Sequence, residues 1–182
     1  MNTQDSHQLE QEILRRRICT GRELAVALGL SQPSLSRHLR NLPVGRLHRI
    51  GVGRRTRYAL RRRIEPVGDH WPLYEVTPAG DARTVGTLHA LEGGGWHLEQ
   101  EEVWPVLRGA VFADGLFPDW PWFLDDLRPQ GFLGRIFARQ FAGEYRAPDD
   151  PRLWRADQVL RALLREGSDL PGAFVLGEEM LA

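Results

Sequence analysis

The sequence predicts an α+β protein made of two modules. Residues 1–65 are expected to form three short helices and a hairpin, and residues 66–182 a small antiparallel sheet with helices. The charge changes sign between them, because the first module holds 14 Arg and five acids (+9) and the second holds 10 Arg and 19 acids (−9). The hydrophobic spacing also changes, from a helical period to strand-like runs separated by Gly and Pro.

The length of 182 residues allows one ordinary domain or two small ones. With 42% hydrophobic residues and six Trp, the chain has enough apolar material for a core, which excludes general disorder. The single cysteine excludes an internal disulfide framework and a cysteine-based zinc site. No apolar run reaches the roughly 20 residues of a membrane span, and no secretory signal is visible, so we expect a cytoplasmic protein.

Three helices are expected in the first module. Apolar residues at helical spacing predict the first between Ser6 and Arg17. Thr20 and Glu23 have capping-box spacing, which starts a second helix at Gly21 and runs it to Leu28. Gly29 is suited to end that helix, and Ser31 is a second N-cap. A third helix is expected to continue to about Leu42.

The third predicted helix separates apolar from polar residues. Leu35, Leu39 and Leu42 share one face and are expected to pack inward. The opposite face carries groups that can meet base edges or phosphates: Gln32, Ser34, Ser36, Arg37, His38 and Arg40. Strand-like runs at 47–50 and 56–60 then flank a glycine- and arginine-rich turn, which predicts a hairpin with a basic tip carrying Arg54, Arg55 and Arg57.

Helix, helix-turn-helix and hairpin together make a winged helix, and residues 20–58 resemble the winged helix-turn-helix of bacterial transcriptional regulators. The resemblance is carried by the segments 21–25 and 31–39. With the charge of +9, it implies double-stranded DNA as the partner of this module. Winged modules also serve as protein-interaction domains. Residues 61–63, three consecutive Arg, could extend the phosphate contacts or form a soluble linker.

The second module is predicted to begin with an antiparallel meander. Its strands are expected at 73–77, 84–91 and 96–98, with turns at 78–81 and at the glycines 93–95. Helices are predicted at 131–142, ending at Gly143, and from Asp150 to Gly167.

Residues 123–135 resemble the N-terminal region of HipA-like serine/threonine kinases, the toxins of bacterial toxin–antitoxin pairs. The runs 73–98 and 169–177 are similar to the same family, so the resemblance covers nearly all of residues 70–182. The branch with an N-terminal winged helix, often called YjjJ, is the most similar. In this family the subdomain packs on the catalytic core, which implies that Trp120, Trp122, Phe123 and Phe132 are candidate anchors for a HipA-like kinase core in cis or in trans.

Catalysis is not expected of this chain. Phosphoryl transfer needs a phosphate-covering loop, a Lys near the phosphates, a catalytic Asp and metal ligands, yet the sequence has no Lys and no kinase-core motif. The expected kinase core would begin where the sequence ends, at Ala182. Glycines 93–95 lie between two predicted strands, which favours a hairpin turn over a nucleotide cradle.

Neither a cofactor nor a metal is expected. The six histidines lack zinc-type spacing. Asp125 and Asp126 are adjacent, which favours a solvated or Arg-paired role over convergence on one ion. Cys19 is expected to be a small buried apolar residue.

These observations predict a non-catalytic DNA-binding regulator of a HipA-like toxin–antitoxin system. Its winged helix would bind operator DNA, and its acidic module would dock on a HipA-like kinase core. Two alternatives stay open: the N-terminal part of a full-length HipA-like kinase toxin, and a transcription factor whose acidic half senses a small ligand. No membrane contact is expected, and a homodimer is left open.

Overall fold

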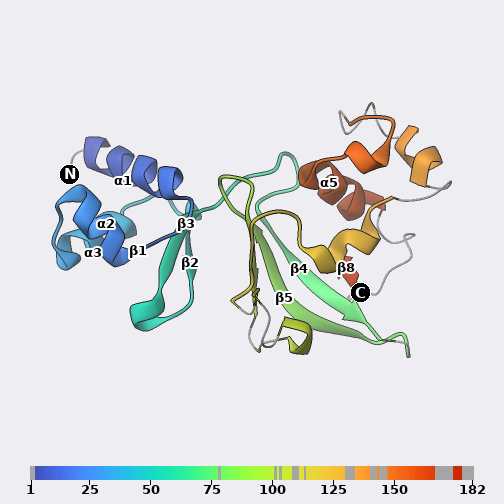
Figure 1. The fold of residues 1–182 in the computed structure, drawn as a ribbon, viewed down its shortest axis with the longest axis horizontal. Coiled ribbons are helices and arrows are strands. Elements are labelled where there is room, and N and C mark those ends of the chain that lie inside the picture. The colour runs from blue at the N-terminus through green and yellow to red at the C-terminus, as the bar shows by residue number, and fades with distance from the viewer. Residues whose placement is uncertain are drawn as a thin grey trace. The chain divides into compact units, whose positions relative to one another are not determined.

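The computed structural model divides the chain into two compact units (Figure 1). One holds residues 1–63 and 90–95, and the other holds residues 64–89 and 96–182. The sequence suggested one boundary, after Glu65, whereas the structure breaks after Arg63 and returns the segment 90–95 to the first unit. The residues that the structure describes are 3–77, 79–100, 102, 104–107, 111–112, 114–129, 134–139, 143, 147–166 and 174–177.

The first unit begins with three helices, α1 (Thr3–Arg16), α2 (Gly21–Leu28) and α3 (Gln32–Arg40). The capping box of α2 is present, because the Thr20 hydroxyl accepts a hydrogen bond from the Glu23 amide (3.2 Å) and the Glu23 carboxylate accepts one from the Thr20 amide (2.7 Å). Helix α3 starts at the Ser31 cap as predicted, but it ends at Arg40, with Asn41 as C-cap, before reaching Leu42.

A three-stranded antiparallel sheet of order β1-β3-β2 completes this unit. Strands β2 (Leu47–Ile50) and β3 (Arg57–Leu60) form the predicted hairpin, and its connection contains the 3-10 helix η1 (Gly53–Arg55). The short strand β1 (Cys19–Thr20) was not predicted. Residues of α1, β1, α2, α3 and β3 share one apolar core, which includes Leu9, Ile13, Cys19, Leu24, Leu35, Leu39 and Leu60.

Residues 90–95 are held in the first unit by polar contacts. The Glu92 amide donates to the Leu60 carbonyl (2.9 Å), and the Arg62 amide donates to the Ala90 carbonyl (2.9 Å). The Arg46 guanidinium also pairs with the Glu92 carboxylate at 2.7 Å. The glycines of this segment form a turn, with Gly93 and Gly94 at φ of +82° and +87°, as expected for a hairpin connection.

The second unit is built on a five-stranded sheet of order β7-β6-β5-β4-β8. The three central strands are the predicted meander, β4 (His70–Val76), β5 (Ala82–Ala90) and β6 (Trp96–Glu99). Two short strands extend it at the edges, β7 (Leu116–Phe117) and β8 (Phe174–Leu176), and neither was predicted. Strand β8 comes from the far end of the sequence and pairs antiparallel with β4.

Short helices accompany this sheet. Three are 3-10 helices, η2 (Pro105–Leu107), η3 (Trp122–Leu127) and η4 (Pro151–Leu153), and α5 (Ala156–Glu166) follows η4. The helix predicted from Asp150 is thus divided in two. The helix predicted at 131–142 is helical at 134–139, and Gly143, its expected end, is itself helical. Leu133 and Phe141, its predicted apolar residues, lie outside the described residues. Among the described helices, none is long and apolar enough to span a membrane.

Candidate nucleic-acid interface

The turn between α2 and α3 fixes the direction of α3. Gly29 takes the left-handed conformation (φ 63°, ψ 29°), and the Leu30 amide donates to the Ala25 carbonyl (2.9 Å). The Ser31 hydroxyl then accepts a hydrogen bond from the Ser34 amide at 3.3 Å. The sequence therefore encodes a stop and a start within three residues.

Helix α3 has one buried face and one exposed face. Leu35 and Leu39 are 1% and 5% exposed and lie in the core. Of the six predicted DNA-contacting side chains on this helix, Gln32, Ser36, Arg37 and Arg40 are exposed, and Ser34 and His38 are half-buried. Arg37 donates to the Ser34 hydroxyl (3.4 Å) and Arg40 to the Ser36 carbonyl (3.3 Å), both within α3. These local bonds occupy few of the five donors of each guanidinium.

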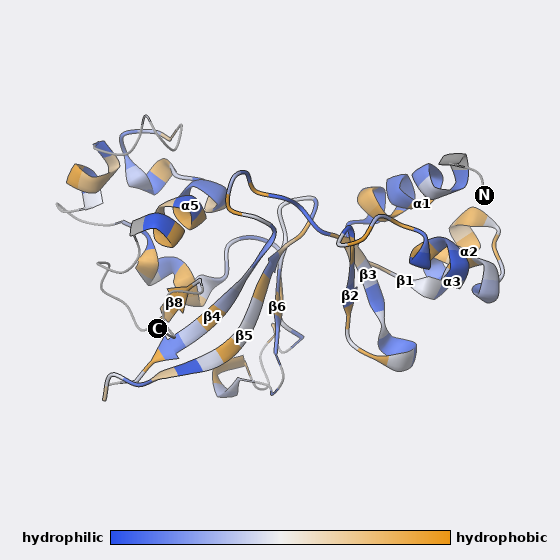
Figure 2. Cartoon of the chain, turned by 180° about the vertical axis from the view of Figure 1, so that it is seen from behind, coloured by the Kyte–Doolittle hydropathy of each residue, from blue (hydrophilic) through white to orange (hydrophobic). Residues whose placement is uncertain are grey.

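The hairpin carries the other predicted contacts. Arg54 and Arg55 are exposed in η1, whereas Arg57 is half-buried in β3 opposite Ile50. The connection is shaped by Gly51 and Gly53, at φ of +75° and +61°. In both views of the first unit, α3 and the tip of the hairpin lie on the same side of α1 (Figures 1 and 2). The structure therefore places α3 and the hairpin tip, each of which carries exposed arginines, on the same side of α1.

Two further exposed residues of the hairpin were missed by sequence reasoning. Arg49 is exposed on β2, where it lies opposite Tyr58. Val52, beside the basic tip, is 87% exposed although it is apolar. The alternation of the 47–50 run contained a signal for Arg49, since it places Arg49 on the opposite face from Ile50.

The candidate partner anchors divide into buried and exposed residues. Trp120 and Phe123 are each 6% exposed. The Trp120 ring packs edge-on against Trp96, and the Phe123 ring edge-on against Trp104, with centroids 5.2 and 5.1 Å apart. Both belong to the core of the second unit, which corrects their prediction as surface anchors. Trp122 is 48% exposed. Phe132 lies outside the described residues.

The other sequence-based candidates have structural roles. The Asp125 carboxylate accepts a hydrogen bond from the Arg128 guanidinium at 2.8 Å, the Arg-paired role expected for it. Cys19 is 2% exposed, and burial raises the pKa of its thiol to about 11.

Three histidines stack across neighbouring strands, which the sequence did not reveal. The ring centroids of His70 and His89 lie 5.6 Å apart, and those of His89 and His97 lie 6.1 Å apart. His89 and His97 are buried, and His89 Nε2 lies 2.9 Å from a Glu99 carboxylate oxygen. In the described part of the chain, no group of three His, Cys, Asp or Glu side chains is placed to hold a metal ion.

Comparison with known proteins identifies the family. Residues 67–182 match the family model of the middle domain of a YjjJ-like toxin. The chain belongs to the YjjJ-like toxin family. It is 33% identical over 160 residues to Toxin YjjJ of Escherichia coli strain K12, and the match covers 86% of this chain and 33% of that toxin.

The match with Toxin YjjJ covers more of the chain than residues 67–182 alone, so the similarity extends into the first unit. The chain spans about a third of the length of that YjjJ toxin. No solved structure matches the chain.

Proposed function

We propose that this member of the YjjJ-like toxin family is a DNA-binding regulator, and that its first unit is a winged helix-turn-helix that binds duplex DNA. One observation carries the proposal: α3 and the hairpin tip, each of which carries exposed arginines, lie on the same side of α1 in a unit whose helices pack around a leucine-rich core. A major groove admits an α-helix, and phosphates attract arginines beside it. Here α3 is the recognition helix and the hairpin is the wing.

The exposed residues have different expected roles. Arg37 lies on α3, where a guanidinium can donate two parallel hydrogen bonds to guanine. Arg55 lies on the hairpin tip, where it reaches phosphates or the minor groove. Arg37→Ala is therefore expected to relax sequence preference, while Arg55→Ala is expected to weaken binding to all duplexes alike or to change only an A·T preference.

Salt dependence tests the DNA proposal directly. Four of the predicted arginines are exposed, Arg37, Arg40, Arg54 and Arg55. If all four meet phosphates, log affinity falls against log salt concentration with a slope of about −3.6, from about −0.9 per contact. Arg54→Ala should then reduce the magnitude of the slope by about 0.9.

Arg15→Ala is the matched control. Arg15 is 65% exposed in the same unit, but it lies on α1 and pairs with Glu12 at 2.7 Å. Its loss should leave the slope unchanged. Binding that is insensitive to salt, or no binding to pooled duplexes at low salt, would contradict the proposal.

For the second unit we propose docking on a HipA-like kinase core, in cis or in trans, within a toxin–antitoxin system. Support comes from the family, from the charge of −9 over residues 66–182, and from Trp122, an aromatic side chain left 48% exposed. The first proposal does not depend on this one. Because the sequence has no Lys and no kinase-core motif, we propose that this unit binds the core and does not itself transfer phosphate.

A pull-down with the kinase core encoded alongside tests docking. If Trp122 is a hot spot, Trp122→Ala lowers the affinity about 30-fold or more while the protein stays folded. Trp120→Ala removes a core side chain and is expected to cost ~3–5 kcal/mol of stability, so it controls for loss of binding by unfolding. A wild-type chain that binds no such core would defeat the docking proposal.

A second candidate function is a regulator that senses a small ligand. The observation that favours it is a pocket in the second unit, lined by three arginines and two aspartates. The N-terminal part of a full-length HipA-like kinase toxin stays an alternative, for which both proposed contacts would be made within one polypeptide.

A further inference from the structure

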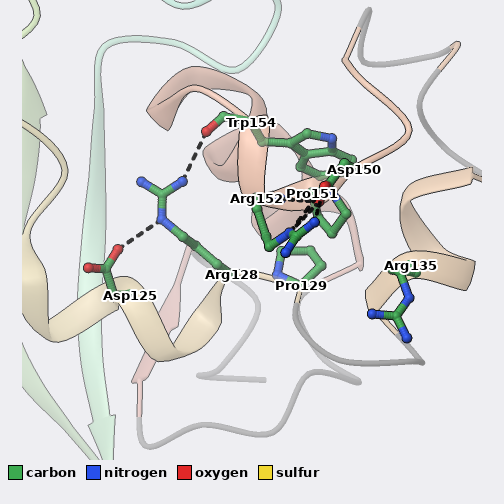
Figure 3. Close-up of a pocket in the computed structure, with 8 residues that line it drawn as sticks. All are labelled: Asp125, Arg128, Pro129, Arg135, Asp150, Pro151, Arg152 and Trp154. Atoms are coloured by element: carbon green, nitrogen blue, oxygen red, sulfur yellow. Dashed lines mark hydrogen bonds and ion pairs between the residues drawn. The ribbon is translucent and has the colours of Figure 1, made fainter.

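The second unit contains a pocket of about 610 Å³ with charged walls (Figure 3). This volume lies within the range of about 300–1,000 Å³ that holds small molecules. Its lining comes from three segments: the end of η3 and the residues after it, the helix at 134–139, and the region of η4. The lining residues are Asp125, Arg128, Pro129, Arg135, Asp150, Pro151, Arg152 and Trp154.

The pocket lies in a basic part of an acidic module. Residues 128–165 contain eight Arg and four acids, a net charge of +4, while the rest of residues 66–182 contains two Arg and 15 acids, a net charge of −13. All three arginines of the pocket belong to the basic segment. A local excess of guanidinium groups within an acidic surface favours an anion at this position.

Two of the arginines are already oriented by carboxylates. Arg128 Nε donates to Asp125 at 2.8 Å, and another nitrogen of the same guanidinium donates to the Trp154 carbonyl at 3.0 Å. Arg152 binds the Asp150 carboxylate with two nitrogens, at 3.0 and 2.6 Å, and this pairing lowers the pKa of Asp150 to about 2. The Asp150 carboxylate therefore stays charged at neutral pH, and each carboxylate holds its arginine in place.

The third arginine has donors to spare. Arg135 forms no hydrogen bond with the described residues, and Figure 3 shows it on a separate helix, beyond the Arg152–Asp150 pair as seen from Arg128. The five charged side chains sum to +1, and the carboxylate that attracts Arg135 is Asp150, which already binds Arg152. A guanidinium with a planar fork of donors suits phosphate oxygens.

We propose that this pocket binds the phosphoryl group of a small ligand, with Arg135 as its main contact. A phosphate brings more than one negative charge and three acceptor oxygens, so it can accept several of the donors of Arg135. Arg128, on the other side of the Arg152–Asp150 pair, would face another part of the ligand. The pocket size admits a ligand as large as a mononucleotide. This inference goes beyond the proposed DNA and docking functions and does not need either of them.

Calorimetric titration of the full chain tests the proposal, with three probes: inorganic phosphate, a nucleoside monophosphate, and the nucleoside without phosphate. Both phosphates should bind and the nucleoside should not. Tighter binding of the monophosphate identifies a nucleotide-type ligand, and equal binding identifies the phosphoryl group alone as the recognised part. Arg135→Gln should weaken phosphate binding about 10-fold or more, because charge-assisted hydrogen bonds are lost.

Arg139→Gln is the matched control, since Arg139 is exposed on the same helix one turn later and does not line the pocket. It should leave phosphate affinity within about twofold of wild type, because Arg139 makes no part of the lining and an exposed charge acts weakly through water. Failure of both phosphates to bind the wild type would overturn the proposal, and so would equal losses in the two variants. DNA affinity measured on the same samples separates this failure from failure of the first unit.

Discussion

Replacing Gly29 tests the turn that orients α3. A Cβ on Gly29 would meet no atom within 4 Å, so a substitution there introduces no clash. The remaining cost is conformational, because the residue sits at φ +63°, where a non-glycine residue costs about 1–2 kcal/mol. Reduced freedom of the unfolded chain offsets about 0.4–1 kcal/mol of this. We expect Gly29→Ala to destabilise the first unit by about 1 kcal/mol.

The chain carries separate probes for its two units. All six Trp residues lie in the second unit, and the only Cys lies in the core of the first. When urea unfolding is monitored by labelling of the Cys19 thiol, the measurement therefore reports the unfolding of the first unit. If the free energy of unfolding falls by about 1–3 kcal/mol per molar urea, Gly29→Ala should lower the urea concentration at the midpoint of Cys19 labelling by about 0.3–1 M.

Gly29→Asn provides the comparison for this prediction. Asn adopts the left-handed conformation more readily than Ala, so Gly29→Asn should destabilise the first unit less than Gly29→Ala does. If Ala at this position were as stable as Gly, or more stable than Asn, the argument from backbone conformation would be wrong. Because Gly29 is not among the predicted DNA contacts, the DNA affinity of the folded variant should equal that of wild type.

Three further predictions concern charge and chemistry. The Thr20 amide and hydroxyl lower the pKa of Glu23, so this carboxylate stabilises the fold above pH 4.5. That contribution is lost as the pH falls through the folded pKa of Glu23. When urea unfolding is compared at pH 7 and pH 3, Glu23→Gln should therefore show a smaller drop in stability than wild type. Burial raises the pKa of the Cys19 thiol to about 11, so a thiol reagent at pH 8 should react slowly with the native chain and fast in urea, and equal rates would contradict the burial argument. The pure chain should transfer no phosphate from ATP, and labelling of itself or of a general substrate would overturn that expectation.

The sequence predicted the first unit better than the second, for a physical reason. Its helix boundaries are encoded locally. The start of α2 is capped by Thr20 and Glu23, its end is set by Gly29, and the start of α3 is capped by Ser31. Each of these contacts spans only a few residues. Strand β1 has only two residues, and its pairing with β3 depends on residues about 40 positions away. Such a strand leaves no periodic pattern to read.

The second unit depends on distant pairings, so its edges were missed. Strand β8 has three residues and pairs with β4, about 100 positions earlier in the chain. The phosphate pocket is likewise assembled from three separate segments, so the spacing of Arg128, Arg135 and Arg152 in the sequence carries no signature of it. The charge excess of residues 128–165 was readable from the sequence, but only the pocket gives that excess a location.

The aromatic residues near η3 show why composition alone does not separate an anchor from a core. Trp120 and Phe123 are buried against other rings, so of the four proposed anchors only Trp122 is exposed among those that the structure describes. One aromatic hot spot contributes about 2 kcal/mol, or about 30-fold in affinity, which is too little for a stable complex by itself. If the second unit docks on a kinase core, we expect its net charge of −9 to speed its association with a basic partner. The association rate should then fall as salt is raised from about 0.01 to 0.15 M, over which the screening length shortens from about 30 to 8 Å. A rate independent of salt would mean that the partner is not recognised through this charge.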